Sequence, residues 1–208
     1  MESGEANLGT LVWSPPGPRR TLWSIGVADR SCAEFKLGDR PRAYALFRHV
    51  PPNLTYRVGV SRPSEDWYYA QIGVGRWTIL FDLARPCSGT AWLTVAIAGA
   101  THRPVVQVRV NDRPIGEFPR LHDGSLYRSS NVGGRYYRAE FAFPASLLRT
   151  GTNSLVFDMV RCAGPPSPGG VAYDIVKLEV EDATMAPPTE PAAQRAAQGE
   201  ASGAAGSG

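Results

Sequence analysis

Short alternating stretches of apolar and polar residues, bounded by glycine and proline, constrain this chain more than any other feature. Residues 55–60 alternate so that Tyr56, Val58 and Val60 share one face, as in a half-buried β-strand. The 208 residues include 22 glycines and 18 prolines, which is typical of short strands joined by many turns. About eight such strands predict an all-β fold, a jelly-roll β-sandwich.

The expected strands follow one another at regular intervals, with no internal repeat. They cover residues 55–60, 68–72, 76–83, 90–98, 105–110, 136–143, 153–160 and 171–180. A turn is expected at 111–114, and a short helical turn at 145–149 that ends at Gly151. Residues 183–208 are rich in small and polar residues and lack aromatic ones, so we expect a disordered tail.

The charge pattern bears on the partners that the chain can have. The formal net charge is +3, and lysine occurs only at Lys36 and Lys177, so arginine supplies the remaining basic residues. The arginines are scattered, whereas a nucleic-acid surface usually shows a basic stripe, so no nucleic-acid partner is expected. No apolar run reaches about 18 residues, so no membrane span is expected. The arginines serve either as a solvated surface or as ligands of an acidic polymer, since guanidinium matches carboxylate.

Cysteines and histidines do not form a recognisable metal site. Cys32, Cys87 and Cys162 lie far apart without a CxxC motif, so zinc is not expected and their pairing stays open. No Asp-rich loop indicates calcium, although a structural calcium ion is an option for such sandwiches, and no other cofactor is expected. The three histidines lie in separate loop-like places, where a solvated side chain is the default.

The first ten residues lack the features of a signal peptide, so the chain is either intracellular or part of a longer precursor.

Two segments are candidates for ligand binding. In Asp66-Trp67-Tyr68-Tyr69, alternation places Tyr68 opposite its neighbours. Either these aromatic residues stack on a sugar ring, or Trp67 and Tyr69 fill the core and Tyr68 is simply exposed. The polar loop at 122–135 is flanked by glycines and either presents binding residues or is a mobile connection. The carbohydrate-binding candidates are Tyr68, Asp123, Tyr127, Arg128, Asn131 and Arg135.

Several motifs in a fixed order resemble a known family. They are LGTLVW at 8–13, LWSIGVADR at 22–30, YRVGVS at 56–61, WTILFDL at 77–83, VRVN at 108–111 and PASLL at 144–148. This order is similar to the C-terminal, third domain of rhamnogalacturonan endolyases, polysaccharide lyase family 4. The resemblance covers about residues 8–181, with a shortened stretch between Phe35 and Tyr56.

The resemblance implies a division of the chain and a fold. Residues 1–21 would be a remnant of a fibronectin-type-III-like domain with a Pro-rich linker, 22–182 a carbohydrate-binding jelly roll, and 183–208 the disordered tail. Asp29-Arg30 and Tyr173-Asp174 recur in the family pattern, and we expect structural roles for them: a buried ion pair and a tyrosine that anchors a loop. The family's catalytic Lys and His lie in its first domain, so no catalytic residue carries over.

Three functions remain open from the sequence. The first is a non-catalytic domain that binds pectic polysaccharide, rhamnogalacturonan I, outside the cell. The second is part of an active endolyase that cleaves by β-elimination, with the catalytic domain in cis but missing from this chain. The third is a structural or interaction β-sandwich without sugar binding. The exact glycan and the oligomeric state stay open.

Overall fold

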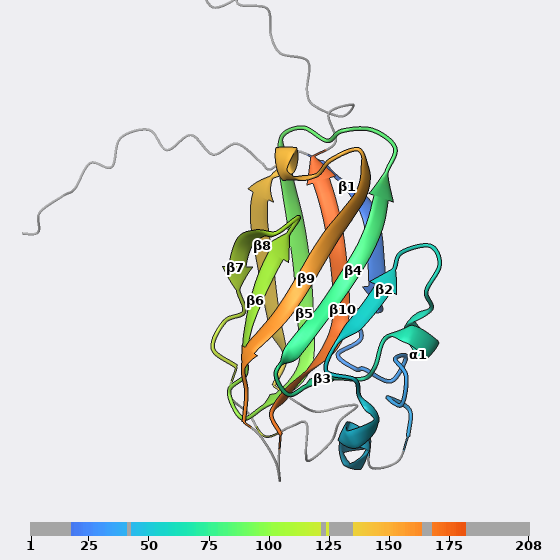
Figure 1. Ribbon diagram of the computed structural model, residues 1–208, viewed down its shortest axis with the longest axis vertical. Coiled ribbons are helices and arrows are strands. Elements are labelled where there is room, and N and C mark those ends of the chain that lie inside the picture. Colours follow the sequence, from blue (N-terminus) through green and yellow to red (C-terminus); the bar gives the residue numbers. More distant parts are fainter. Residues whose placement is uncertain (1–17, 41–42, 122–123, 125–134, 164–167, 182–208) are drawn as a thin grey trace, which may run out of the picture. The chain divides into compact units, whose positions relative to one another are not determined.

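The computed structural model describes residues 18–40, 43–121, 124, 135–163 and 168–181, and residues 19–181 form one compact unit. The predicted all-β sandwich is confirmed: two five-stranded sheets lie face to face (Figure 1). The strands are β1 (Arg19–Gly26), β2 (Leu54–Arg57), β3 (Gln71–Ile72), β4 (Gly75–Leu83), β5 (Thr90–Thr101), β6 (Val105–Val110), β7 (Arg113–Glu117), β8 (Tyr137–Pro144), β9 (Gly151–Arg161) and β10 (Gly170–Glu181). Helical turns are short, at η1 (Ala43–His49), α1 (Pro63–Asp66) and η2 (Ala145–Leu147).

The strand order mixes distant parts of the chain. One sheet has the order β1-β10-β5-β8, with β3 pairing with β10, and the other has the order β2-β4-β9-β6-β7. Neighbouring strands are antiparallel except for β2 and β4, which run parallel. Among the residues described, no helix is long and apolar enough to span a membrane.

Alternation within each strand explains which side chains fill the space between the sheets. In β4, Trp77, Ile79 and Phe81 point inward and are buried, as their spacing of two predicts. In β6, Val106, Val108 and Val110 are buried with the same spacing, and a register shift relative to β9 falls between Val105 and Val106.

The core is built around the indole of Trp67, which is fully buried. Its ring centroid lies 4.9 Å from that of Trp77, 5.4 Å from Tyr173 and 5.8 Å from Tyr56, and each pair meets edge to face. Edge-to-face pairs bring the positive ring edge against a negative ring face. Trp67 and Tyr69 therefore serve the core, as one of the two interpretations of the aromatic run predicted.

The ends of several strands differ from the sequence-based expectation. The run at 55–60 stops being a strand at Arg57, and Val60 is 72% exposed, because the chain turns at Gly59 with φ of +80°. Of residues 68–72, only Gln71–Ile72 form a strand. The edge strand β7 falls where a turn was expected, and it includes Pro114, which an edge strand tolerates because one side of its backbone needs no partner.

Strand β1 begins at Arg19, inside the segment expected to be a linker. It pairs with β10, so that Arg19 lies opposite Glu181 and Gly26 lies opposite Ile175. The division of the whole chain into three segments stays a prediction, since residues 1–17 and 182–208 lie outside the described part.

Candidate functional site

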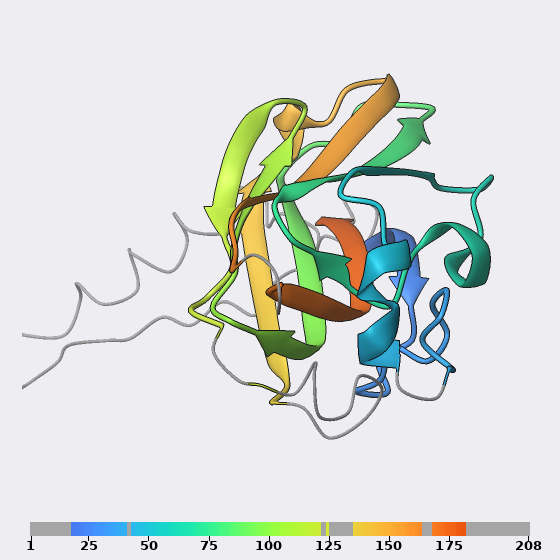
Figure 2. The same cartoon turned by 60° about the horizontal axis from the view of Figure 1, so that its bottom comes forward.

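One end of the sandwich gathers the chain segments that carry most of the candidate chemistry. Strands β5 and β9 end here and β6 and β10 begin here, because Thr101 pairs with Gly170 and Arg161 pairs with Val105. Strand β8 also begins at this end, with Tyr137 opposite Ile97. Figure 2 turns this end toward the viewer. We call it the loop end.

A pocket of about 590 Å³ lies at the loop end between the segments that follow β5, β7 and β9. Three arginines line it, Arg103, Arg120 and Arg161, together with His102 and a single acidic residue, Glu117. All three arginines are exposed, and within the described residues none forms an ion pair. We call this the basic pocket. Its guanidinium groups can bind a carboxylate, to which they donate two parallel hydrogen bonds in a planar geometry.

The backbone at the rim of the basic pocket adopts an uncommon conformation. His102 and Arg103 are consecutive and have φ angles of +59° and +52°. Residues other than glycine rarely occupy this left-handed region, which costs about 1–2 kcal/mol per residue. Such strain often accompanies a site where side chains must be held in a set direction. Here it holds two basic side chains in the turn between β5 and β6.

The binding candidates predicted from the polar loop adjoin this pocket in the sequence. Leu121 lines the pocket and directly precedes the loop, whereas Asp123, Tyr127, Arg128 and Asn131 lie outside the described residues. Arg135 is exposed, and its guanidinium carbon lies 5.4 Å from the ring centroid of Tyr137. Arg135 does not line the basic pocket.

Tyr68 lies apart from the pocket and is not in a strand. It forms an isolated bridge with Lys36, whose ammonium nitrogen lies 4.9 Å from the centre of the Tyr68 ring. The ring is half-buried, so part of it remains accessible. Its role in stacking on a sugar stays a prediction.

A buried carboxylate fixes the segment that follows β1 at the loop end. Asp174 is fully buried, and its Oδ1 accepts hydrogen bonds from the backbone N–H groups of Asp29 and Arg30, each at 3.1 Å. Its Oδ2 accepts a hydrogen bond from the Tyr136 hydroxyl at 2.8 Å. Burial, with help from Asp174, raises the pKa of Tyr136 to about 12. Asp174 thereby ties three chain segments together.

Of the roles expected for the two family dipeptides, the ion pair was wrong and the tyrosine anchor is found at a different segment. No ion pair between Asp29 and Arg30 is found in the described structure; the Arg30 guanidinium lies instead over the Tyr136 ring, at 5.2 Å. The Tyr173 hydroxyl donates a hydrogen bond of 2.7 Å to Oε1 of the buried Gln71. The tyrosine therefore anchors β3, and the loop after β1 is anchored by the neighbouring Asp174.

Two further carboxylates near Asp174 also accept hydrogen bonds from backbone N–H groups. Asp29 accepts a hydrogen bond from the Ser31 N–H, and Glu34 accepts one from the Val27 N–H, each at 2.9 Å. Burial raises the pKa of Glu34. In the described part of the chain, no group of three or more His, Cys, Asp or Glu residues is placed to hold a metal ion. These acids act as acceptors for backbone groups.

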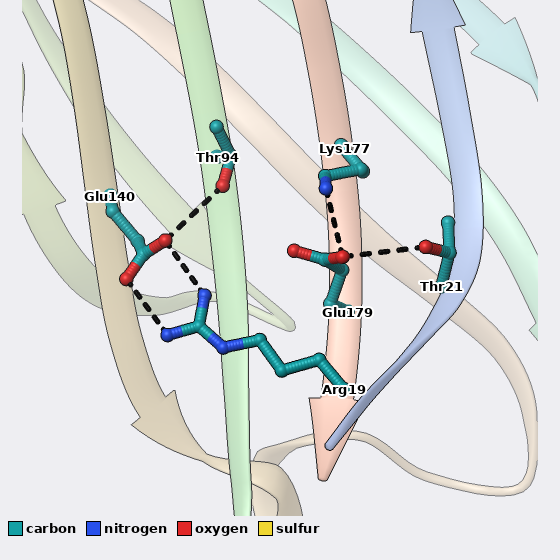
Figure 3. Close-up of polar contacts among 6 residues, drawn as sticks. All are labelled: Arg19, Thr21, Thr94, Glu140, Lys177 and Glu179. Carbon is teal, nitrogen blue, oxygen red and sulfur yellow. Dashed lines mark hydrogen bonds and ion pairs between the residues drawn. The ribbon is translucent and has the colours of Figure 1, made fainter. Parts of the chain in front are cut away.

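A second polar cluster covers the outer face of the sheet that contains β1, β10, β5 and β8 (Figure 3). Arg19 forms a two-pronged ion pair with Glu140, at 2.8 and 3.2 Å, and its guanidinium lies 4.1 Å from the centre of the Trp92 ring. The hydrogen bond from Arg19 lowers the pKa of Glu140. Lys177 pairs with Glu179 at 2.8 Å. Each charge here has an opposite partner, so the cluster solvates the sheet, whereas the arginines of the basic pocket remain available to a ligand.

A family model matches residues 21–178 of this chain, and it describes the CBM-like domain III of polysaccharide lyase family 4. The match covers most of the chain. The chain belongs to this family.

The curated relatives that this chain matches are much longer proteins. The chain is 34% identical to the rhamnogalacturonate lyase of Dickeya dadantii, in a match that covers 86% of this chain and 30% of the relative. It is 25% identical to a probable rhamnogalacturonate lyase C of Aspergillus oryzae, covering 72% of this chain and 29% of the relative. The chain thus spans about a third of the length of these relatives.

Among solved structures, a family 35 carbohydrate-binding module from an environmental isolate matches with 20% sequence identity and a TM-score of 0.34. That match covers 51% of this chain and 66% of the module.

Sequence reasoning missed the basic pocket of this domain. Two of its arginines, Arg103 and Arg120, lie in separate loops and the third, Arg161, is the last residue of β9, and each looks like an ordinary surface arginine. Only the strand order brings them together, because β6 and β9 are neighbours while β5 belongs to the opposite sheet. The available signal was the choice of arginine over lysine in loops beside strand ends.

Proposed function

We propose that this domain binds the acidic backbone of pectic polysaccharide, rhamnogalacturonan I, outside the cell, and that it does not itself cleave the polymer. The observation that carries the proposal is the basic pocket at the loop end. Three guanidinium groups that form no ion pair within the described part of the chain, around a pocket of about 590 Å³, suit the carboxylate of a galacturonate residue. The binding surface would extend from Arg120 into the polar loop with Asp123, Tyr127, Arg128, Asn131 and Arg135.

The family supports a role beside a catalytic domain. Relatives named as rhamnogalacturonate lyases carry this domain as about a third of their length. A domain that holds the polymer raises the concentration of cleavable bonds near a linked catalytic domain. We therefore assign β-elimination to a catalytic domain in cis, and polysaccharide binding to this chain.

The test is a titration of the purified chain with rhamnogalacturonan oligosaccharides, followed by calorimetry and NMR. A double variant, Arg103→Gln with Arg161→Gln, should weaken binding by about ten-fold, because each lost charged hydrogen bond in an exposed site is worth about 0.5–1 kcal/mol. The matched control is Arg85→Gln, an exposed arginine in the loop between β4 and β5 at the opposite end. It should leave the affinity unchanged.

Two further ligands separate charge from shape. An oligosaccharide whose carboxyl groups are reduced to alcohols should bind the wild type as weakly as the native oligosaccharide binds the double variant. High salt should weaken binding of the native oligosaccharide alone, since exposed charges are screened. A wild-type chain that binds no pectic oligosaccharide would favour a structural or interaction β-sandwich instead. Tyr68→Ala tests the separate stacking candidate in the same titration.

A further inference from the structure

A larger pocket, of about 680 Å³, lies on the outer face of the sheet that contains β4 and β9. Two apolar side chains line it that are unusually accessible: Val74 is 60% exposed and Val160 is 43% exposed. Exposed apolar side chains beside polar groups in a pocket are typical of ligand-binding surfaces. We call this the valine pocket.

Polar groups complete the valine pocket. The Asn53 side-chain oxygen accepts a hydrogen bond of 2.9 Å from the Arg76 backbone N–H, which fixes the carboxamide at the rim. The Arg76 guanidinium forms an ion pair of 2.9 Å with Asp158. The hydroxyl of Thr78 also lines the pocket. These groups supply donors and acceptors for hydroxyl groups, while the paired Arg76 and Asp158 leave the pocket nearly neutral.

The end of strand β9 connects the valine pocket to the basic pocket. Asp158, Met159 and Val160 line the valine pocket, and the next three residues, beginning at Arg161, line the basic pocket. Successive residues in a strand are about 3.3 Å apart and point to opposite faces. Val160 and Arg161 therefore face different sides of β9, and a ligand that contacts both passes around the end of this strand at Arg161.

We infer that the valine pocket is a subsite for a 6-deoxyhexose, the rhamnose residue of the polymer whose galacturonate occupies the basic pocket. This inference rests on the proposed function. A 6-deoxyhexose carries a methyl group where most hexoses carry a hydroxymethyl group, and its other ring positions carry hydroxyls. Val74 and Val160 match the methyl group, and Asn53, Thr78 and the Arg76–Asp158 pair match the hydroxyls.

The order of the two pockets matches an alternating polymer. An acidic sugar next to a deoxy sugar needs a cationic surface beside an apolar one, which is what Arg161 and Val160 provide. A polymer of galacturonate alone would place a carboxylate against the valine side chains, which costs desolvation. The two pockets together therefore favour rhamnogalacturonan over homogalacturonan.

The first test follows the valine methyl groups by NMR. The chain is made in the bacterial cytoplasm, so that the glycosylation sequence at Asn53 stays unmodified. It is titrated with L-rhamnose and, as the matched control, with L-mannose, which differs only by the hydroxyl at C6. The methyl signals of Val74 and Val160 should shift with L-rhamnose and much less with L-mannose. Equal shifts, or no shift at high sugar concentration, would overturn the inference.

The second test compares two oligosaccharides. The double variant Val74→Ser with Val160→Ser should bind a rhamnogalacturonan oligosaccharide about four-fold more weakly, the gain from burying one methyl group. Its affinity for oligogalacturonate should match that of the wild type. Val60→Ser is the control, since Val60 is 72% exposed and lines neither pocket. An unchanged affinity of the double variant for rhamnogalacturonan would contradict the deoxyhexose subsite.

Failure of the proposed function gives a different result. If the wild type binds neither oligosaccharide, the basic pocket does not hold an acidic polymer, and the proposed function is wrong. The titration with L-rhamnose still decides the valine pocket in that case, because it involves no carboxylate. If both oligosaccharides bind equally well and Arg161→Gln weakens both, the proposed function stands and the deoxyhexose inference is wrong.

Discussion

Replacing Asp174 by alanine should destabilise the domain strongly, because this carboxylate serves three donors from inside the protein. Its side chain is fully buried and accepts hydrogen bonds from the N–H groups of Asp29 and Arg30 and from the hydroxyl of Tyr136. Each buried donor left without a partner costs about 1–3 kcal/mol. Since water can reach the half-buried Tyr136, we count mainly the two backbone groups and expect a loss of about 3–5 kcal/mol.

The stability loss of Asp174→Ala can be compared with the losses expected for two further variants. Asp174→Asn keeps one carbonyl oxygen for the two backbone N–H groups, so it should cost about 1–2 kcal/mol. Asp82→Ala is the control: Asp82 also accepts hydrogen bonds, from Arg57 and Thr152, but its side chain is 59% exposed. Its loss should cost less than about 1 kcal/mol, because water replaces the lost partners.

The assay is urea unfolding followed by tryptophan fluorescence, with the free energy taken by linear extrapolation. The expected order of stability is wild type, Asp82→Ala, Asp174→Asn and then Asp174→Ala. If Asp174→Ala loses no more stability than Asp82→Ala, the buried carboxylate does not hold the three segments together. Asp174→Asn should also bind oligosaccharide as the wild type does.

Three other measurements test the core, the buried thiol and the absence of catalysis. Trp77→Ala should cost about 3–5 kcal/mol in thermal or urea unfolding, because the side chain is fully buried among other rings. Burial raises the pKa of Cys32 to about 12 from 9.0, so the folded chain keeps a proton that the unfolded chain releases. The stability that Cys32 contributes is therefore present below about pH 9 and should be lost as the pH rises to about 12. If a Cys32→Ala variant loses as much unfolding free energy as the wild type over this pH range, the prediction is wrong. Incubation with rhamnogalacturonan I should give no rise in absorbance from unsaturated uronate, and a sustained rise from the pure chain would show that it is an enzyme.

The strands could be predicted where the pattern within one strand is regular. Residues Trp77, Ile79 and Phe81 alternate without interruption, and β4 was found almost to the residue. Strand β1 was missed because its register with β10 shifts between Thr21 and Trp23, which breaks the alternation. Strand β7 was missed because Pro114 and Gly116 are turn residues in most settings.

The candidate site could be predicted only in part, for a different reason. The sequence singled out the polar loop because its length and glycines are local features, and its role in binding stays a prediction. The basic pocket depends on residues 103, 120 and 161, which the two sheets bring together at one end. No local pattern encodes that proximity, and the ion pairs that distinguish Arg19 from Arg161 are also visible only in the fold.

The path of the chain separates the basic pocket from the ends of the described segment. Strand β1 begins and β10 ends at the same end, since Arg19 lies opposite Glu181, and the basic pocket lies at the other end of the same sandwich. The two ends of the described chain, Arg19 and Glu181, therefore lie at the end of the sandwich opposite the basic pocket. Arg19, near the start of β1, is paired with Glu140, whereas Arg103, Arg120 and Arg161 of the basic pocket form no ion pair within the described residues, so the proposed capacity to bind an acidic polymer lies at the loop end.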